Sequence, residues 1–498
     1  MVEKALRVTA YAVTLFIISI PCPCADISTS ALIGYFTGIP TLSDSFTGLT
    51  AHQEHPAACA LERRPYIEFD GNRHEILRNL QGSGGTIANG LASIGVYYPL
   101  AKDRAGCLVS YLDNYKANSW PFLEDNFHAA TSYDTGRASV TLFTSGPRLF
   151  RTGITIGKQI RGDGDGLLYL FEIAGALPYG LSGTARYCTI PYDGGFDVSY
   201  ESVTKLLPWH FSHTGYEGNL SWRLPKEFIL SAALARKSIA TPGNFRGHSH
   251  QHAQVWEGDG NAWSVKVEKR GFRGVDASIS YGRDDLSGEL GLWYNESHYL
   301  RSFIRGDIHR LSLETVFPEQ SPLVPSFRYD TVSTDGVLSH GIVDSWPFTP
   351  RQMELIGDKT WTFSGTGSIV SHAGTFTWFV RPEYRWKLSF ARAYLDYYLR
   401  IRTRDHLSAN IMDMLFGELR TETSRIQYYD FALVAFERSL SWDRYAFEIA
   451  VSQLVPLRHR KIGVSGKTSV SSSLPRMELT KPKRFGGFSI IGNMKLFL

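Results

Sequence analysis

Three histidines lie at alternate positions in the segment GHSHQH, at His248, His250 and His252. Residues two apart share one face of an extended strand. Their imidazoles could therefore bind Zn²⁺ or Cu²⁺ together. A polar external loop with solvated histidines has the same spacing. We expect no bound metal, and this triplet is the candidate to check.

Other residue types that could do chemistry lack the surrounding pattern. Asp163 and Asp165 in RGDGDG are spaced like the start of a calcium loop, but the distal glutamate of such a loop is missing. Asp307 and His309 have the right types for acid–base chemistry, yet no GxSxG or comparable motif appears in the chain. We therefore expect no enzyme activity and no cofactor.

Most charged side chains belong to a different pattern, in which polar and apolar residues alternate. The segment GYEGNLSWRLPKEFILSAALARK at 215–237 has Leu220 and Trp222 at even positions and Glu217 and Arg223 at odd ones. A period of two residues is that of a β-strand with two unlike faces. This segment is therefore predicted to be a hairpin.

The same period recurs through most of the chain, and helical periodicity is nearly absent. It predicts 16 to 20 amphipathic strands, about 18 as the central value. Tight turns and long polar connections are both present, as in outer-membrane barrels, where turns are periplasmic and loops external. The alternating segments are 88–100, 137–143, 215–237, 263–268, 275–281, 375–381, 385–390, 393–402, 445–452 and 488–498.

Aromatic residues favour a membrane barrel over a soluble sandwich, which also alternates. Several lie near the predicted strand ends on the apolar faces, as the aromatic girdles of a membrane barrel do. Closure would also remove the exposed edges of so large a sheet. We predict an all-β fold, a closed antiparallel transmembrane β-barrel of about 18 strands. The aromatic residues concerned are Tyr216, Trp222, Trp263, Tyr281, Trp378, Trp386 and Tyr445.

The energy of burying charge then assigns the two faces. A lysine or arginine that faces lipid at mid-bilayer costs about 2–4 kcal/mol, so basic residues of the strands should face the lumen. A basic lumen would favour anionic solutes. Cross-strand pairs with acids, which brace a closed interior, explain the same residues equally well. The predicted lumen-lining basic residues are Arg223, Arg381, Arg385, Lys387, Arg400 and Arg402.

The N-terminus has the composition of a targeting segment. Lys4 and Arg7 precede the apolar run VTAYAVTLFIISIP, and Ala25 is a suitable residue before a cut. Residues 1–25 are therefore predicted to be a signal peptide. An uncleaved anchor helix and a lipoprotein carrying lipid on one of the nearby cysteines are the alternatives.

The chain is therefore divided into three parts, of which the signal peptide at residues 1–25 is the first. Residues 26–80 are expected to be an N-terminal segment at the periplasmic side or the first strand. Residues 81–498 are expected to form the barrel. The formal charge of +4 in 498 residues, with no long basic run, argues against nucleic-acid binding.

The chain resembles bacterial outer-membrane β-barrel proteins. More narrowly, it resembles uncharacterised Bacteroidota-type barrels, which are TonB-receptor-like but lack a plug domain. The resemblance is carried by YIEFDGNRHEILRNLQGSGG at 66–85, GCLVSYLDNYKANSW at 106–120 and FGGFSIIGNMKLFL at 485–498. A TonB receptor has a plug domain of over a hundred residues before its barrel. Residues 26–80 are too few for one, so the resemblance implies a barrel without a plug.

The expected function is porin-like or receptor-like passage or binding of an unknown solute in the outer membrane. Outer-membrane lipid is the expected surrounding, and the barrel assembly machinery is expected to insert the chain. Two alternatives stay open: a structural or partner-binding surface barrel with a blocked lumen, and a barrel enzyme.

Overall fold

The computed structural model describes the strands of the chain and many of the tight turns between them. The described residues are 56–58, 62–78, 86–101, 104–121, 127–146, 150–160, 166–176, 178–200, 203–241, 252–272, 274–294, 297–317, 324–343, 359–381, 383–405, 419–468 and 485–498.

The described elements are eighteen strands and three short 3₁₀ turns, η2 Pro56–Ala58, η4 Pro178–Gly180 and η5 Pro225–Glu227. No helix in the described part of the chain is long and apolar enough to cross a membrane. The strands are β1 Tyr66–Arg78, β2 Thr86–Ala101, β3 Ala105–Pro121, β4 Phe127–Ser145, β5 Arg151–Gln159, β6 Leu167–Ala176, β7 Leu181–Tyr200, β8 Val203–Leu224, β9 Phe228–Ala240, β10 His252–Phe272, β11 Val275–Tyr294, β12 Ser297–Val316, β13 Val324–Val343, β14 Lys359–Arg381, β15 Tyr384–Asp405, β16 Leu419–Ser441, β17 Tyr445–Thr468 and β18 Phe485–Phe497.

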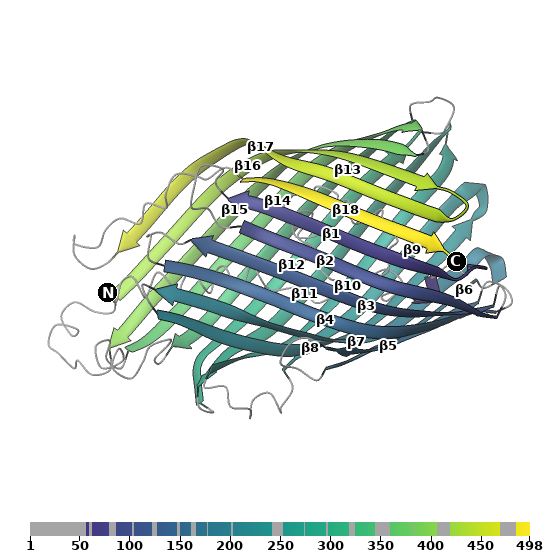
Figure 1. The fold of residues 1–498 in the computed structure, drawn as a ribbon. Helices are drawn as coiled ribbons and strands as arrows, with labels where there is room; N and C mark the ends of the chain where they lie inside the picture. The colour runs from purple at the N-terminus through teal and green to yellow at the C-terminus, as the bar shows by residue number, and fades with distance from the viewer. Residues whose placement is uncertain are drawn as a thin grey trace.

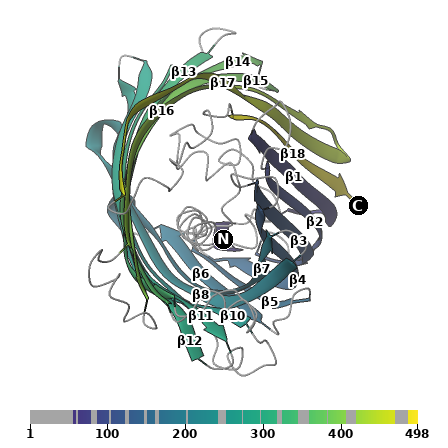
Figure 2. The same cartoon turned by 90° about the vertical axis from the view of Figure 1, so that its left-hand side faces the viewer.

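Each strand pairs antiparallel with the next along the chain, and the last pairs with the first. The closing ladder runs from Tyr66 opposite Phe497 to Arg78 opposite Phe485. The result is one 18-stranded sheet closed on itself, with strongly tilted strands in side view (Figure 1) and a ring in the view along its axis (Figure 2). The predicted closed antiparallel barrel of about 18 strands is confirmed.

The wall has fewer strands at the end where the long connections leave it. Strands β5, β6 and β9 are short. β4 pairs with β5 along Arg137–Ser145, but beyond the hairpin its residues Phe127–Tyr133 pair directly with β7. Beyond the end of β9, β10 reaches β8 at Gln254 opposite Trp209. Three strands therefore stop partway up the barrel.

The opposite end carries the tight turns and both described chain ends. At η5, Lys226 and Glu227 have positive φ, which closes the β8–β9 hairpin within three residues. Gly271 and Gly274 take the same backbone region at the β10–β11 turn, where glycine carries no steric cost. By analogy with outer-membrane barrels this is the periplasmic end, and it is called so below.

The barrel begins earlier in the chain than residue 81. Strand β1, Tyr66–Arg78, lies within the segment 26–80 and pairs with both β2 and β18. Residues 26–80 were expected to lie at the periplasmic side or to form the first strand. Residues 66–78 within that segment form the first strand. Residues 1–25, the predicted signal peptide, lie outside the described residues.

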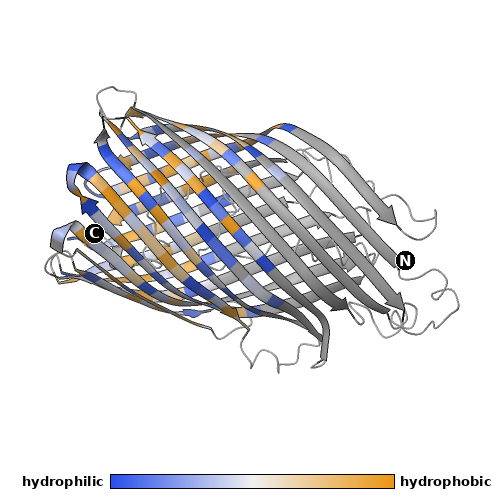
Figure 3. Ribbon diagram, turned by 180° about the vertical axis from the view of Figure 1, so that it is seen from behind, coloured by the Kyte–Doolittle hydropathy of each residue, from blue (hydrophilic) through white to orange (hydrophobic). Residues whose placement is uncertain are grey.

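The outer face of the wall is apolar over the periplasmic half of each strand. Directly paired residues share a face, so the register carries the face assignment around the ring. All seven aromatic residues expected in the girdles lie on the outer face, each between 40% and 58% exposed. Figure 3 shows hydrophobic and hydrophilic positions alternating along the strands in the half that carries the C-terminus.

Candidate functional site

The inner face of the barrel is the first candidate site, and paired hydroxyl groups line part of it. Ser110 and Ser139 lie 3.1 Å apart, and Thr141 and Thr155 lie 2.9 Å apart. On the far side of the ring, β14 and β15 carry another such pair at 2.8 Å. Each pair joins two neighbouring strands, so the hydroxyls satisfy each other across the ladder.

The clearest ionic group on the inner face joins β15 to β16. Glu437 accepts contacts from Arg385 Nε at 3.1 Å and Lys387 Nζ at 2.7 Å. The glutamate side chain is 2% exposed, whereas the arginine and lysine are 30% and 21% exposed. Two of the predicted basic residues therefore face inward and share one carboxylate.

Two further inner carboxylates are also paired. Arg186 contacts Glu217 at 2.6 Å between β7 and β8. Glu68, which is fully buried, accepts a 2.6 Å hydrogen bond from Asn493 and lies 3.8 Å from Lys495 Nζ. These contacts agree with the alternative explanation of the inner charges, in which cross-strand ion pairs stabilise the barrel wall.

Arg223 lies at the periplasmic mouth. Its register position is on the inner face, next to the turn η5, where it contacts Glu227 at 2.7 Å. Both side chains are more than half exposed. The mouth pair is therefore hydrated and close to neutral.

The other three predicted basic residues are placed by backbone alone. Arg381 ends β14, beyond a register irregularity, and its side chain is not described. Arg400 and Arg402 belong to the same unbroken strand as Arg385 and Trp386. Counted along β15, they take the outer positions of Trp386, not the inner ones of Arg385.

The backbone register of β15 therefore does not support the prediction that Arg400 and Arg402 line the lumen, and their place there stays a prediction. Sequence periodicity divided this region into two strands, each with its polar residues inside. One continuous strand cannot change face without a bulge, and β15 has none against β16.

The histidine triplet is not assembled into a described site. His248 and His250 lie outside the described residues, as do Asp163 and Asp165, and His252 is the first residue of β10. In the described ranges no group of three or more metal-binding side chains occurs.

A segment ahead of β1 packs against the inner wall of β4, β5 and β6. The backbone N–H of Ala57 donates a 2.9 Å hydrogen bond to Glu172, which is buried on the inner face of β6. Pro56 lies so close to β5 that a Cβ on Gly153 would be 2.4 Å from it. The turn η2 therefore occupies part of the lumen. The three residues PAA carry no periodicity that would predict a position in the lumen.

Aromatic rings fill the periplasmic end of the same wall. Tyr97 stacks on Tyr66 at 4.7 Å and on Phe143 at 5.8 Å between centroids, and its hydroxyl donates to the Glu62 carbonyl at 2.9 Å. A Cβ on Gly106 would lie 2.5 Å from the Tyr97 ring. This cluster ties the segment before β1 to the barrel wall.

Polarity reverses on the outer face about halfway up the strands. Trp222 and Leu230 near the turns are followed by Arg236 on β9 and by Asn261 on β10. Further round the ring come ion pairs and tyrosine–histidine contacts, again on outer positions. We call these residues the polar ring. They are Arg236, Asn261, Arg283–Asp307 at 2.9 Å, Tyr281–His309 at 2.8 Å, Tyr329–His372 at 2.9 Å and Arg392–Asp430 at 2.7 Å.

The polar ring and the turns bound an apolar belt. From Phe228 at the turn to Arg236 the strand rises roughly 20 Å along the barrel axis, from about 3.3 Å per residue and a tilt near 40°. That is close to the height of the apolar band of membrane barrels, about 25 Å. Beyond the ring the inner face takes up apolar side chains instead, since Phe211 and Ile239 are buried on inner positions.

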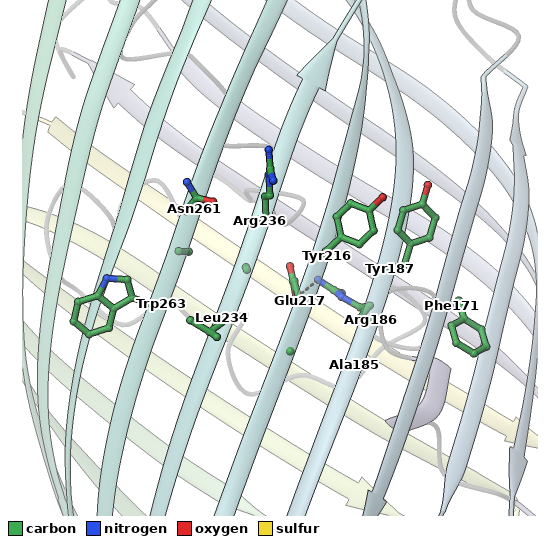
Figure 4. Close-up of a pocket in the computed structure, with 13 residues that line it drawn as sticks. Phe171, Ala185, Arg186, Tyr187, Tyr216, Glu217, Leu234, Arg236, Asn261 and Trp263 are labelled. Atoms are coloured by element: carbon green, nitrogen blue, oxygen red, sulfur yellow. Dashed lines mark hydrogen bonds and ion pairs between the residues drawn. The ribbon is translucent and has the colours of Figure 1, made fainter.

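A groove of about 620 Å³ lies on the outer face where the belt meets the polar ring. Phe171, Gly218, Leu234 and Trp263 belong to its apolar part, and Arg236 lies at its far end (Figure 4). No sequence motif indicates this groove, since it is assembled from the five strands β6 to β10.

No family model matches the chain, and no curated protein matches it. Among solved structures it is similar to Pseudomonas aeruginosa OpdK with vanillate, at 10% identity and a TM-score of 0.38, covering 87% of this chain and 98% of that one. Acinetobacter baumannii OccAB2 gives 9% identity and 0.36, with 86% and 97% covered. A bacterial polysaccharide outer membrane secretin gives 9% and 0.28, with 88% and 100% covered. The fold described above rests on the strand register of this chain, independently of these similarities.

Proposed function

We propose that this chain is a passive channel of the bacterial outer membrane for small polar solutes. One observation carries the proposal: a closed ring of 18 strands has an apolar belt outside and paired hydroxyl and ionic groups inside. Barrels of 16 to 18 strands are wide enough for a water-filled passage, whereas eight strands are filled by side chains. The chain is not an enzyme under this proposal.

The charge of the lumen is set by a few groups. Arg186–Glu217 and Arg223–Glu227 are one-to-one pairs, whereas Glu437 faces two cations. The group on β15 and β16 therefore gives the passage a mild preference for anions.

Purified protein in planar bilayers tests the channel. The expected result is stepwise conductance with a reversal potential, under a salt gradient, on the anion side. A gel-shift on heating reports independently whether the barrel is folded. Folded protein that gives neither conductance nor solute-dependent swelling of liposomes would rule the channel out.

A second function is favoured by the turn η2 in the lumen. A barrel whose passage is filled by its own N-terminal segment would serve as a surface scaffold that binds partners. Deleting residues 26–61 distinguishes the two. A barrel blocked by this segment is silent before the deletion and conducts only after it, whereas a partly occupied channel conducts in both states, more after it.

We also propose a narrower relationship, to Bacteroidota-type barrels. The segments 66–85, 106–120 and 485–498 support a Bacteroidota-type barrel that is TonB-receptor-like but has no plug domain. TonB-dependent transporters have 22 strands, so the 18 strands favour the porin-like side of the comparison. Insertion by the barrel assembly machinery is proposed with it, and depletion of that machinery should leave the chain unfolded in the periplasm.

A further inference from the structure

The groove on the outer face combines an apolar floor with a cation at one end. Phe171 and Leu234 are 43% and 69% exposed, and Trp263 is 40% exposed, so the floor is open to the surroundings of the barrel. Figure 4 shows the side chains of Arg236 and Asn261 above these residues, toward the end where β9 terminates. The groove therefore runs from the apolar belt into the polar ring.

Arg236 differs from the outward cations elsewhere in the polar ring. Arg283 contacts Asp307 and Arg392 contacts Asp430. In the register, Arg236 lies between Tyr216 on β8 and Asn261 on β10, and neither is an acid. In the described part of the chain its guanidinium has no carboxylate partner.

The two residues directly paired with Arg236 supply hydrogen-bonding groups without negative charge, whereas Asp259 lies two residues from Asn261 on the same face of β10. Tyr216 is 58% exposed and packs against Tyr187, with ring centroids 5.0 Å apart. The amide nitrogens of Asn261, backbone and side chain, both donate to Asp285, which orients that side chain. A planar guanidinium beside phenol groups fits an oxyanion such as phosphate.

The floor of the groove has room for a hydrocarbon chain. Gly218 lies on the outer face between Ala185 and Leu234, and a Cβ built on it would meet nothing within 4 Å. A groove that is apolar along the belt and cationic at the outer rim matches a lipid whose headgroup carries phosphate.

We propose that this groove binds a phosphate-bearing lipid of the surrounding leaflet, with its headgroup on Arg236 and an acyl chain along Gly218, Leu234 and Trp263. The proposal rests on the membrane location proposed above, and not on whether the lumen conducts. Binding would anchor the lipid beside the point where β9 ends.

Native mass spectrometry of the detergent-solubilised barrel tests the site. The probes are diphosphoryl lipid A, phosphatidylglycerol and a neutral galactosyl diacylglycerol. Wild type is expected to retain the two phosphate lipids at about tenfold lower concentration than the neutral one, as a charge-assisted hydrogen bond supplies. R236Q should remove that difference, and R236K should keep part of it, because lysine is a point charge without the planar fork.

Matched variants separate the groove from general effects. K237Q removes a charge from the neighbouring residue, which faces the lumen, and should keep the wild-type lipid preference. Gly218→Leu fills the floor and should weaken retention of all three lipids. Gly492→Leu is its control, since Gly492 takes an outer position on β18 with nothing nearer than 3.8 Å to a Cβ.

Three results would overturn the proposal. One is an unchanged lipid preference in folded R236Q, and another is equal retention in Gly218→Leu and Gly492→Leu. The third is displacement of the lipid by inorganic phosphate at equal concentration, which would indicate a site for free anions. Loss of conductance alone concerns the channel and leaves the lipid result standing.

Discussion

The inner face of β1–β6 is packed, whereas that of β14–β17 is lined by paired polar side chains. On the first side the Tyr97 cluster and η2 exclude water from the wall. On the second, Glu437 holds two cations that remain partly exposed, next to the small cluster of Ala435, Ala450 and Ile491. One half of the ring thus packs against the N-terminal segment, and the other half presents partly exposed charged side chains to the lumen.

The largest effect should come from removing η2 from the packed side. Gly153→Val places its Cβ where Pro56 lies, so the segment must leave while β5 keeps its ladder. Conductance in planar bilayers should rise severalfold. Gly492→Val serves as the control, and equal conductance in both variants would mean that η2 does not narrow the passage.

The next largest effect concerns the aromatic cluster of that side. Gly106→Val drives a side chain into the Tyr97 ring, which is held by its hydroxyl bond to Glu62. Overpacking of this kind costs about 3 kcal/mol. The free energy of unfolding, measured by urea titration in detergent against Gly492→Val, should fall by that amount. A loss below about 1 kcal/mol would show that the ring moves freely.

On the polar side, Glu437→Gln leaves Arg385 and Lys387 without their shared carboxylate. Because both cations are partly hydrated, the loss of stability should be on the order of 2 kcal/mol, less than for a fully buried pair. The reversal potential should move further toward anions. Arg223→Gln, at the hydrated mouth, is the comparison and should leave stability within about 0.5 kcal/mol. Equal shifts of potential in the two variants would contradict a selectivity set at Glu437.

The smallest effect should be equal on the two sides. Thr141→Ala and Thr375→Ala each remove one hydroxyl of a cross-strand pair, Thr141–Thr155 or Thr375–Ser389. Each should cost about 1 kcal/mol by urea titration, the net worth of one hydrogen bond. A clearly larger cost at Thr141 would indicate that packing on its side adds to the hydrogen bond.

Sequence periodicity predicted the barrel well wherever lipid faces the wall. Trp222 and Trp386 lie outside and Arg385 and Lys387 inside, as the cost of charge in lipid requires. It does not carry over to Arg400 and Arg402, because it split one continuous strand into two and so changed the face assignment partway along β15. The alternation has a period of two on both sides of the polar ring. It therefore cannot show where the outer face changes from apolar to polar.

The candidate sites were less accessible to sequence reasoning than the fold. Glu437 was missing from the predicted lumen residues, although it neutralises two of them. The position of Ala57 in the lumen and the groove at Arg236 depend on strands far apart in the chain. Such contacts follow from register and closure, which local patterns do not contain.

The short β5–β6 hairpin makes the size of this barrel adjustable. β4 and β7 already pair beyond the hairpin, from Phe127 opposite Tyr200 to Tyr133 opposite Gly194. Extending that ladder toward the turns would place Ser139 opposite Cys188, and both are inner residues. Excising the hairpin would therefore let its two neighbours zip together with their faces matched. A ring without this hairpin would leave every other strand with its present partner, since β4 and β7 already pair.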